Sequence, residues 1–165
     1  MNVSPELLEL LRQIEQSDVA QAIRGVSWLY PVLESVHILG IGLLYGAAVA
    51  VDLRQIGVGR RRIPVRAVTR GLLPLSHVGF GLAAVSGLAM FIGVAVAVVR
   101  SDAFLLKYGL ILVAAINILV FHFGIYRRVD LWNDGPTPVA AKVAGCVSIV
   151  CWTGTVFAGR WLAYA

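Results

Sequence analysis

A run of roughly 20 mostly apolar residues begins after Pro31 and ends at Asp52, which is long enough to cross the hydrocarbon core of a bilayer. The run contains two ionisable side chains, Glu34 and His37, which stand three positions apart and therefore share one face of a helix. Ionisable groups are costly inside a membrane, and they usually face the protein interior or a water-filled cavity. This stretch therefore indicates a spanning helix that carries the first candidate functional residues.

The composition is typical of an integral membrane protein. Of the 165 residues, 59% are hydrophobic and only 14% are charged, whereas a soluble domain has about a quarter charged residues. Three further apolar runs follow the first one. We therefore expect an all-α integral membrane four-helix bundle in a single domain, with spans at residues 29–53, 72–99, 104–126 and 139–162.

The segment 4–24 predicts an amphipathic helix that lies in the membrane interface. Ser4 and Pro5 fit the N-cap and the first helical position, and leucines then recur at helical spacing with charged residues among them. Such a helix rests on a membrane rather than crossing it. The segment also lacks the apolar core of a cleavable signal peptide.

The basic residues predict the orientation of the chain. Nine of the fourteen Lys and Arg residues lie in the loops 52–71 and 127–142, and five lie elsewhere. The positive-inside rule therefore predicts that both loops are cytoplasmic and that both termini lie on the opposite side. Because this topology explains the net charge of +5, we do not expect nucleic acid as a partner.

Small residues at four-residue spacing predict where the helices pack closely. They are Gly42, Gly46 and Ala50 in the first span, Gly79, Ala83 and Gly87 in the second, and Thr155 and Gly159 in the fourth. These glycine seams fit helix packing within one bundle or between the protomers of a homo-oligomer. Cys146 and Cys151 form neither a CxxC nor a haem-attachment motif, and we interpret them as reduced packing residues.

Each of the three histidines lies inside a predicted span. His77 follows Arg70 by seven residues and His122 precedes Arg127 by five, so both are expected roughly 8–10 Å inside the cytoplasmic boundary. Imidazoles at equal depth on antiparallel helices suit a haem b with two histidine ligands. We therefore predict His77 and His122 as ligands of the haem iron. Alternatively, each histidine reaches the interface or bonds a backbone carbonyl.

His37 is expected in the other half of the membrane, about 15 Å from the other two histidines along the normal. With Glu34 it can form a proton relay, a histidine with its supporting carboxylate, or half of an ExxH metal site. A metal site needs a carboxylate from another span, and the other three spans contain no Asp or Glu. His37 can also ligate a second haem, or the pair can simply hydrogen-bond the first span to its neighbours.

Several segments together resemble a family of small bacterial four-span integral membrane proteins of unknown function. They are Trp28 to Pro31, Glu34 to Gly40, Asp52 to Arg54, Phe104 to Lys107, Phe121-His122 and Gly159 to Trp161. The resemblance covers nearly the whole chain and implies a four-span fold in the bacterial cytoplasmic (inner) membrane. With the orientation predicted from the basic residues, both termini are expected to be periplasmic. More distantly, the plan is similar to that of b-type membrane cytochromes and of membrane proteins of the copper-resistance type.

The leading hypothesis is therefore an integral membrane protein that binds haem b and passes electrons to a membrane redox partner. The first alternative is a non-enzymatic accessory subunit that packs against a larger membrane complex. The second is a small channel or carrier for protons or metal ions, with the histidines along its path. The sequence contains no Walker loop, nucleophile elbow or HExxH motif.

Overall fold

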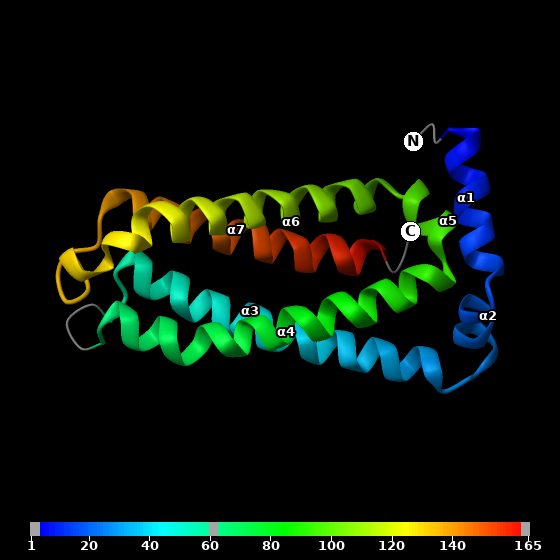
Figure 1. Ribbon diagram of the computed structural model, residues 1–165, viewed down its shortest axis with the longest axis horizontal. Helices are drawn as coiled ribbons and strands as arrows, with labels where there is room; N and C mark the ends of the chain where they lie inside the picture. Colours follow the sequence, from blue (N-terminus) through cyan, green and yellow to red (C-terminus); the bar gives the residue numbers. More distant parts are fainter. Residues whose placement is uncertain (1–3, 60–62, 163–165) are drawn as a thin grey trace.

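The computed structural model describes residues 4–59 and 63–162, and these residues form helices and connections without any strand. Four helical stretches are long and apolar enough to cross a membrane: Leu29–Ile56, Val65–Gly93, Asp102–Leu131 and Val139–Leu162. They run along the long axis of the molecule, each antiparallel to the one before it (Figure 1). The prediction of an all-α bundle of four apolar helices is confirmed.

The four long helices are packed in a defined order. They are α3 (Leu29–Ile56), α4 (Val65–Gly93), α6 (Asp102–Val120) and α7 (Val139–Leu162). Helix α3 packs against both α4 and α7, and α7 also packs against α6. Helices α3 and α7 are therefore the central pair, because each of them also packs against one outer helix.

Two glycines allow α3 and α4 to approach closely. A Cβ on Gly40 would lie 2.7 Å from the backbone nitrogen of Ala83, and a Cβ on Gly79 would overlap the backbone of α3. In contrast, a Cβ on Gly42 or on Gly46 would meet open space. The predicted glycine seam of α4 thus packs inside the bundle, and its partner on α3 is Gly40. Gly42 and Gly46 of the predicted seam on α3 do not make this contact, because the rotation of α3 turns them outward.

Two short helices, α1 (Pro5–Gln16) and α2 (Asp18–Gly25), lie across one end of the bundle, which we name the cap end (Figure 1). The segment 4–24, which is predicted to be helical, forms two helices that Ser17 divides. The Ser17 hydroxyl donates to the carbonyl of Ile14 at the end of α1 and accepts from the amide of Ala20 at the start of α2. Helix α1 buries Leu11 in a cluster with Ala95 and Val99.

Helix α4 ends at Gly93, so the predicted span 72–99 is divided between α4 and the short helix α5 (Ala95–Arg100). Val94 has φ −142° and ψ 33°, which interrupts the helix. Two charged side chains of the cap bond the backbone groups beside this break. Arg24 donates to the carbonyl of Gly93 at 2.7 Å, and Glu15 accepts from the amide of Val96 at 2.8 Å.

The opposite end, which we name the loop end, contains residues 57–59 and 63–64 and the connection 132–138. Helix α4 begins there at Val65, seven residues before the predicted start of its span. Helix α6 continues into a π turn, η1 (Phe121–Ile125), and a 3-10 turn, η2 (Tyr126–Leu131). A buried cluster closes this end, and its members are Val65, Phe121, Val129, Trp132, Ala141 and Ala144.

Candidate functional site

Asp52 carries a buried carboxyl group between α3 and α7. Its exposed fraction is only 5%, and the hydroxyl of Ser148 on α7 lies beside it as the neighbouring hydrogen-bond donor. The second oxygen, Oδ2, is buried and has no hydrogen-bond partner among the described residues. A buried polar atom without a partner requires an explanation, such as a role in the chemistry or a bound water or ion. Asp52 is therefore the strongest candidate site in the bundle.

Arg54 does not neutralise Asp52, although it lies only two residues away. Residues two apart on a helix point about 200° apart, and Arg54 donates instead to the backbone carbonyls of Ile63 and Asn133. The ion pairs found within 4–59 and 63–162 lie elsewhere, between Arg12 and Glu9 and between Arg66 and Asp130. The Asp52 carboxyl group is thus held by a neutral hydroxyl.

A second polar contact joins α3 and α7 nearer the middle of the bundle. The hydroxyl groups of Tyr45 and Thr153 lie 3.0 Å apart and form a hydrogen bond. Tyr45 precedes Asp52 by seven residues, or about two turns, and so lies on the same side of α3. The apolar cluster around this contact contains Leu44, Ala114, Cys151 and Trp152.

His37 bridges α3 and α4 in the cap half of the bundle. Its Nδ1 lies 2.8 Å from the carbonyl oxygen of Ala83 and 3.1 Å from the hydroxyl oxygen of Ser86. Since the Ser86 hydroxyl donates to the carbonyl of Leu82, both of these oxygens are available as acceptors, and Nδ1 carries the hydrogen in a neutral ring. The other nitrogen, Nε2, then keeps a free lone pair.

Lys107 of α6 places a cationic side chain in the same half of the bundle. It is partly buried, and its Nζ would lie only 3.4 Å from a Cβ on Gly159, so this glycine makes room for it beside α7. The Lys107 ammonium group is also close enough to act electrostatically on His37. Two bases from different helices therefore lie near each other at the cap half.

The structure places His77 and His122 in different surroundings. His77 is exposed and lines a pocket of about 280 Å³ together with Arg70 and Tyr126. His122 bonds the carbonyl of Ile118 through Nδ1 at 3.0 Å, and its ring packs against Tyr126 at a centroid distance of 5.5 Å. Tyr126 thus contacts the His122 ring and lines the same pocket as His77, and each histidine has its own environment.

The helix contacts fix the depth of His77 and of His37. The His37 ring lies against the backbone of Gly87, and Gly79 packs against the backbone of Leu44. His77 precedes Gly79 by two residues, so it is nearly level with Leu44, close to the middle of α4. The predicted span 72–99 has His77 near its start. In the structure, twelve residues of α4 precede His77, because the helix begins at Val65.

His122 lies much nearer the loop end. Asn117 donates to the carbonyl of Ala144 at 2.9 Å, and Gly145, the next residue of α7, packs against the backbone of Asp52. His122 is a further five residues toward the loop end. At 1.5 Å per residue, His77 and His122 differ in depth by on the order of 15 Å, whereas metal–imidazole bonds are about 2 Å long. The geometry therefore does not bring the two predicted ligands to one iron.

Glu34 is exposed, and in the described part of the chain it forms no hydrogen bond to His37, whose partners are on α4. The predicted pair shares a helix face but not a contact. Within residues 4–59 and 63–162, no group of three His, Cys, Asp or Glu side chains is arranged to hold a metal ion.

The sequence does not predict three residues of the candidate site, which are Asp52, Tyr45 and Lys107. From the sequence, Asp52 is interpreted as the end of the first span, but α3 continues to Ile56 and ends at Gly57, which has φ 116°. A glycine that accepts this left-handed conformation is the signal that marks the true helix end. Ser148 carries no comparable signal, because its approach to Asp52 depends on how α7 packs.

No protein-family model, curated protein or solved structure matches this chain.

Proposed function

We propose that this protein moves protons across the membrane along helix α3. The observation that carries the proposal is Asp52, a carboxyl group exposed by only 5% inside a helix long enough to span a bilayer. Acidic residues at such positions are rare, and they commonly serve as proton relays in pumps and transporters. Of the alternatives predicted from the sequence, a small proton channel or carrier agrees best with this group.

The groups that can hold or pass a proton follow one another along the bundle axis. His37 and Lys107 lie in the cap half, the Tyr45–Thr153 pair lies near the middle, and Asp52 lies nearest the loop end. The rise along α3 is about 12 Å from His37 to Tyr45 and about 10 Å from there to Asp52. Hydroxyl groups both donate and accept hydrogen bonds, so the central pair can relay a proton between waters on its two sides.

Each ionisable group has a separate role in this proposal. Asp52 takes a proton on its free Oδ2 while Ser148 keeps its other oxygen in place. His37 takes or releases a proton at Nε2, because Nδ1 is held by the Ala83 carbonyl. Lys107 contributes a positive charge to the same half of the bundle, from the side of α6.

Proton flux into liposomes tests the proposal. The full chain is reconstituted into potassium-loaded vesicles that contain a pH-sensitive dye, and valinomycin then sets a membrane potential that draws protons inward. We expect faster acidification than in protein-free vesicles, and at least a tenfold loss of this excess flux in Asp52→Asn. Glu34→Gln is the matched control, because it removes an exposed carboxyl group from the same helix, and it should keep the full flux.

Wild-type vesicles no faster than protein-free ones would overturn the proposal, and so would a fully active Asp52→Asn protein. Size-exclusion chromatography in detergent separates a folded variant from an aggregated one. Where Asp52→Asn aggregates, Ser148→Ala gives the milder test, because it leaves the carboxyl group present but removes its hydroxyl donor. Its flux should fall as well.

A second candidate is haem b-dependent electron transfer, and it is favoured by the pocket that His77 shares with Arg70 and Tyr126. His77 would supply an axial nitrogen, and the Arg70 guanidinium group would pair with a propionate. The test is an optical spectrum of the purified protein before and after dithionite. A sharp reduced Soret band that is lost in His77→Ala and kept in His122→Ala supports this candidate, and a colourless protein after haem-supplemented expression ends it.

A further inference from the structure

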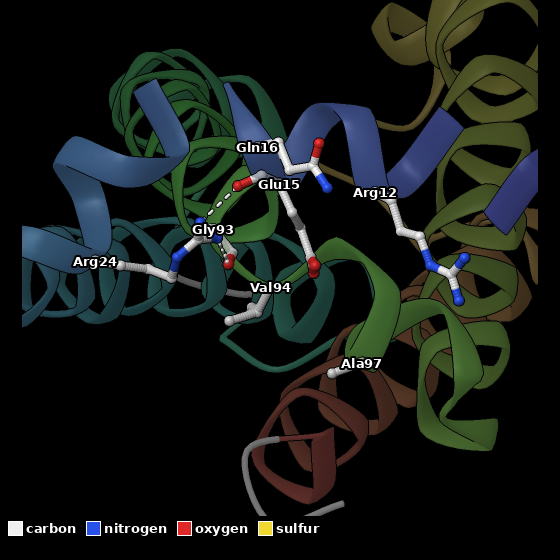
Figure 2. Close-up of a pocket in the computed structure, with 7 residues that line it drawn as sticks. All are labelled: Arg12, Glu15, Gln16, Arg24, Gly93, Val94 and Ala97. Carbon is white, nitrogen blue, oxygen red and sulfur yellow. Dashed lines mark hydrogen bonds between the residues drawn. The ribbon is translucent and has the colours of Figure 1, made fainter. Parts of the chain in front are cut away.

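A pocket of about 380 Å³ opens at the cap end, where α1 and α2 meet the break between α4 and α5. Four polar side chains from the two cap helices line it, and Val94 and Ala97 contribute an apolar side. The polar members are Arg12, Glu15, Gln16 and Arg24, which Figure 2 shows together. The pocket is separate from the groups assigned above to proton movement.

The walls of this pocket are held by the chain itself. The Arg24 guanidinium group donates to the backbone carbonyls of Gly93 and Glu15, and both acceptors are neutral. The Glu15 carboxyl group accepts from the Val96 amide through Oε1. The positive charge of Arg24 is thus positioned without a carboxylate bound to it, and Oε2 of Glu15 is left over for a ligand.

Arg12 supplies the second positive charge. Its nearest carboxylate is Glu9, at 3.8 Å, and both side chains of this pair are more than half exposed, so the pair contributes little and is easily exchanged. In the view of Figure 2 the Glu15 carboxyl group lies between the guanidinium groups of Arg12 and Arg24. The pocket therefore offers positive charge on both sides of a negative group, which suits a zwitterion.

The surroundings of the pocket are those of a membrane interface. The cap helices lie across the end of apolar helices that are long enough to span a bilayer (Figure 1), and they expose Leu7, Leu10 and Val19. An amphipathic helix in this orientation rests at the boundary between head groups and acyl chains. A ligand held here thus lies at the depth of phospholipid head groups, and its apolar part can run past Val94 and Ala97.

We propose that this pocket binds the phosphoethanolamine head group of a phospholipid. The phosphate lies against the Arg12 guanidinium group, which is exposed and only loosely paired with Glu9, since guanidinium groups bind phosphate through charge-assisted hydrogen bonds. The primary ammonium group donates to Oε2 of Glu15 and to the side-chain oxygen of Gln16. A choline head group cannot make these donations because its nitrogen carries no hydrogen, and a glycerol head group makes them without the charge.

The test is a thermal-unfolding experiment on the detergent-purified full chain with short-chain phospholipids added at increasing concentration. We expect phosphatidylethanolamine to raise the Tm at a concentration at least tenfold lower than phosphatidylcholine or phosphatidylglycerol of the same chain length. Arg12→Ala should remove this preference, and it is a safe substitution because Arg12 is exposed. Arg127→Ala, an exposed arginine near the loop end, is the matched control and should keep the preference.

The source of the head group is tested with soluble phosphoethanolamine, which lacks acyl chains. A much weaker effect of the soluble compound supports a lipid ligand, and an equal effect overturns the lipid and assigns the pocket to a free phosphate ester. Equal stabilisation by all three lipids would overturn the proposal, and so would an unchanged preference in Arg12→Ala. None of these results depends on whether the protein conducts protons.

Discussion

Asp52 of α3 and Ser148 of α7 lie side by side between the two central helices, toward the loop end of the bundle, and the Asp52 carboxyl group keeps one buried oxygen without a partner in the described chain. The two residues are far apart in the sequence. Their contact links the two central helices at the point where proton movement is proposed, so it affects both stability and transport.

Ser148→Ala is expected to destabilise the bundle by about 1–3 kcal/mol, because it leaves a buried carboxyl group without its donor. Replacement of both partners by apolar residues removes this penalty, so the double variant Asp52→Leu with Ser148→Ala should be more stable than Ser148→Ala alone. Unfolding by a denaturing detergent in mixed micelles measures both free energies. A double variant that is the less stable of the two would show that the carboxyl group does not depend on Ser148.

Two glycines, Gly79 of α4 and Gly42 of α3, should respond oppositely to the same substitution. Gly79→Ala places a methyl group on the backbone of α3 and should cost about 1–3 kcal/mol through overpacking. Gly42→Ala adds the same group in open space and should be neutral, or stabilising by up to about 1 kcal/mol through reduced backbone freedom. The two unfolding free energies are compared in one detergent, and equal values would contradict the helix contact.

Arg24→Ala should loosen the cap while leaving the long helices intact. The substitution removes both hydrogen bonds through which α2 holds the end of α4 and the end of α1, each worth about 1.5–3 kcal/mol for a charged donor. Hydrogen–deuterium exchange should therefore accelerate over α1, α2 and α5. Exchange in the middle of α3 and α7 should not change, and acceleration there would indicate global unfolding instead.

At the loop end, Asn133→Ala should destabilise more than Arg66→Ala. The Asn133 side chain accepts from the backbone amide of Arg66 at 3.0 Å and helps to begin α4. The Arg66 side chain instead pairs with Asp130 on an exposed surface, where a salt bridge contributes about 0–1 kcal/mol. Thermal unfolding of the two variants at low and at high salt separates the effects, because only the Arg66 contribution should shrink as salt rises.

The sequence predicts elements well where the signal is local. The fourth predicted span, 139–162, has the same bounds as α7, since its apolar run begins directly after a proline-rich loop. The second span is less well placed, because Pro74 lies inside α4 rather than at its start, and Arg66 and Arg70 before it are also helical. No pattern of apolar or charged residues around Val94 predicts the helix break there, because the side chains that stabilise it come from α1 and α2.

The candidate site, too, is predicted from the sequence only where the signal is local. His37 is selected from the sequence, but its partners are Ala83 and Ser86 rather than Glu34, because Glu34 turns outward. His77 and His122 are predicted at equal depth from the loop arginines, yet α4 starts seven residues earlier than its predicted span, and the two side chains are separated along the axis.

The sequence by itself determined that this chain forms four long apolar helices with short polar connections, because hydropathy and helix capping are properties of neighbouring residues. Only the tertiary structure decided that Asp52 lies beside Ser148, that Tyr45 bonds Thr153, and that Lys107 lies in the same half of the bundle as His37. These contacts depend on the rotation and the relative shift of whole helices. Close packing at a few small residues, such as Gly40 and Gly79, sets both quantities, and it acts between segments that are distant in the sequence.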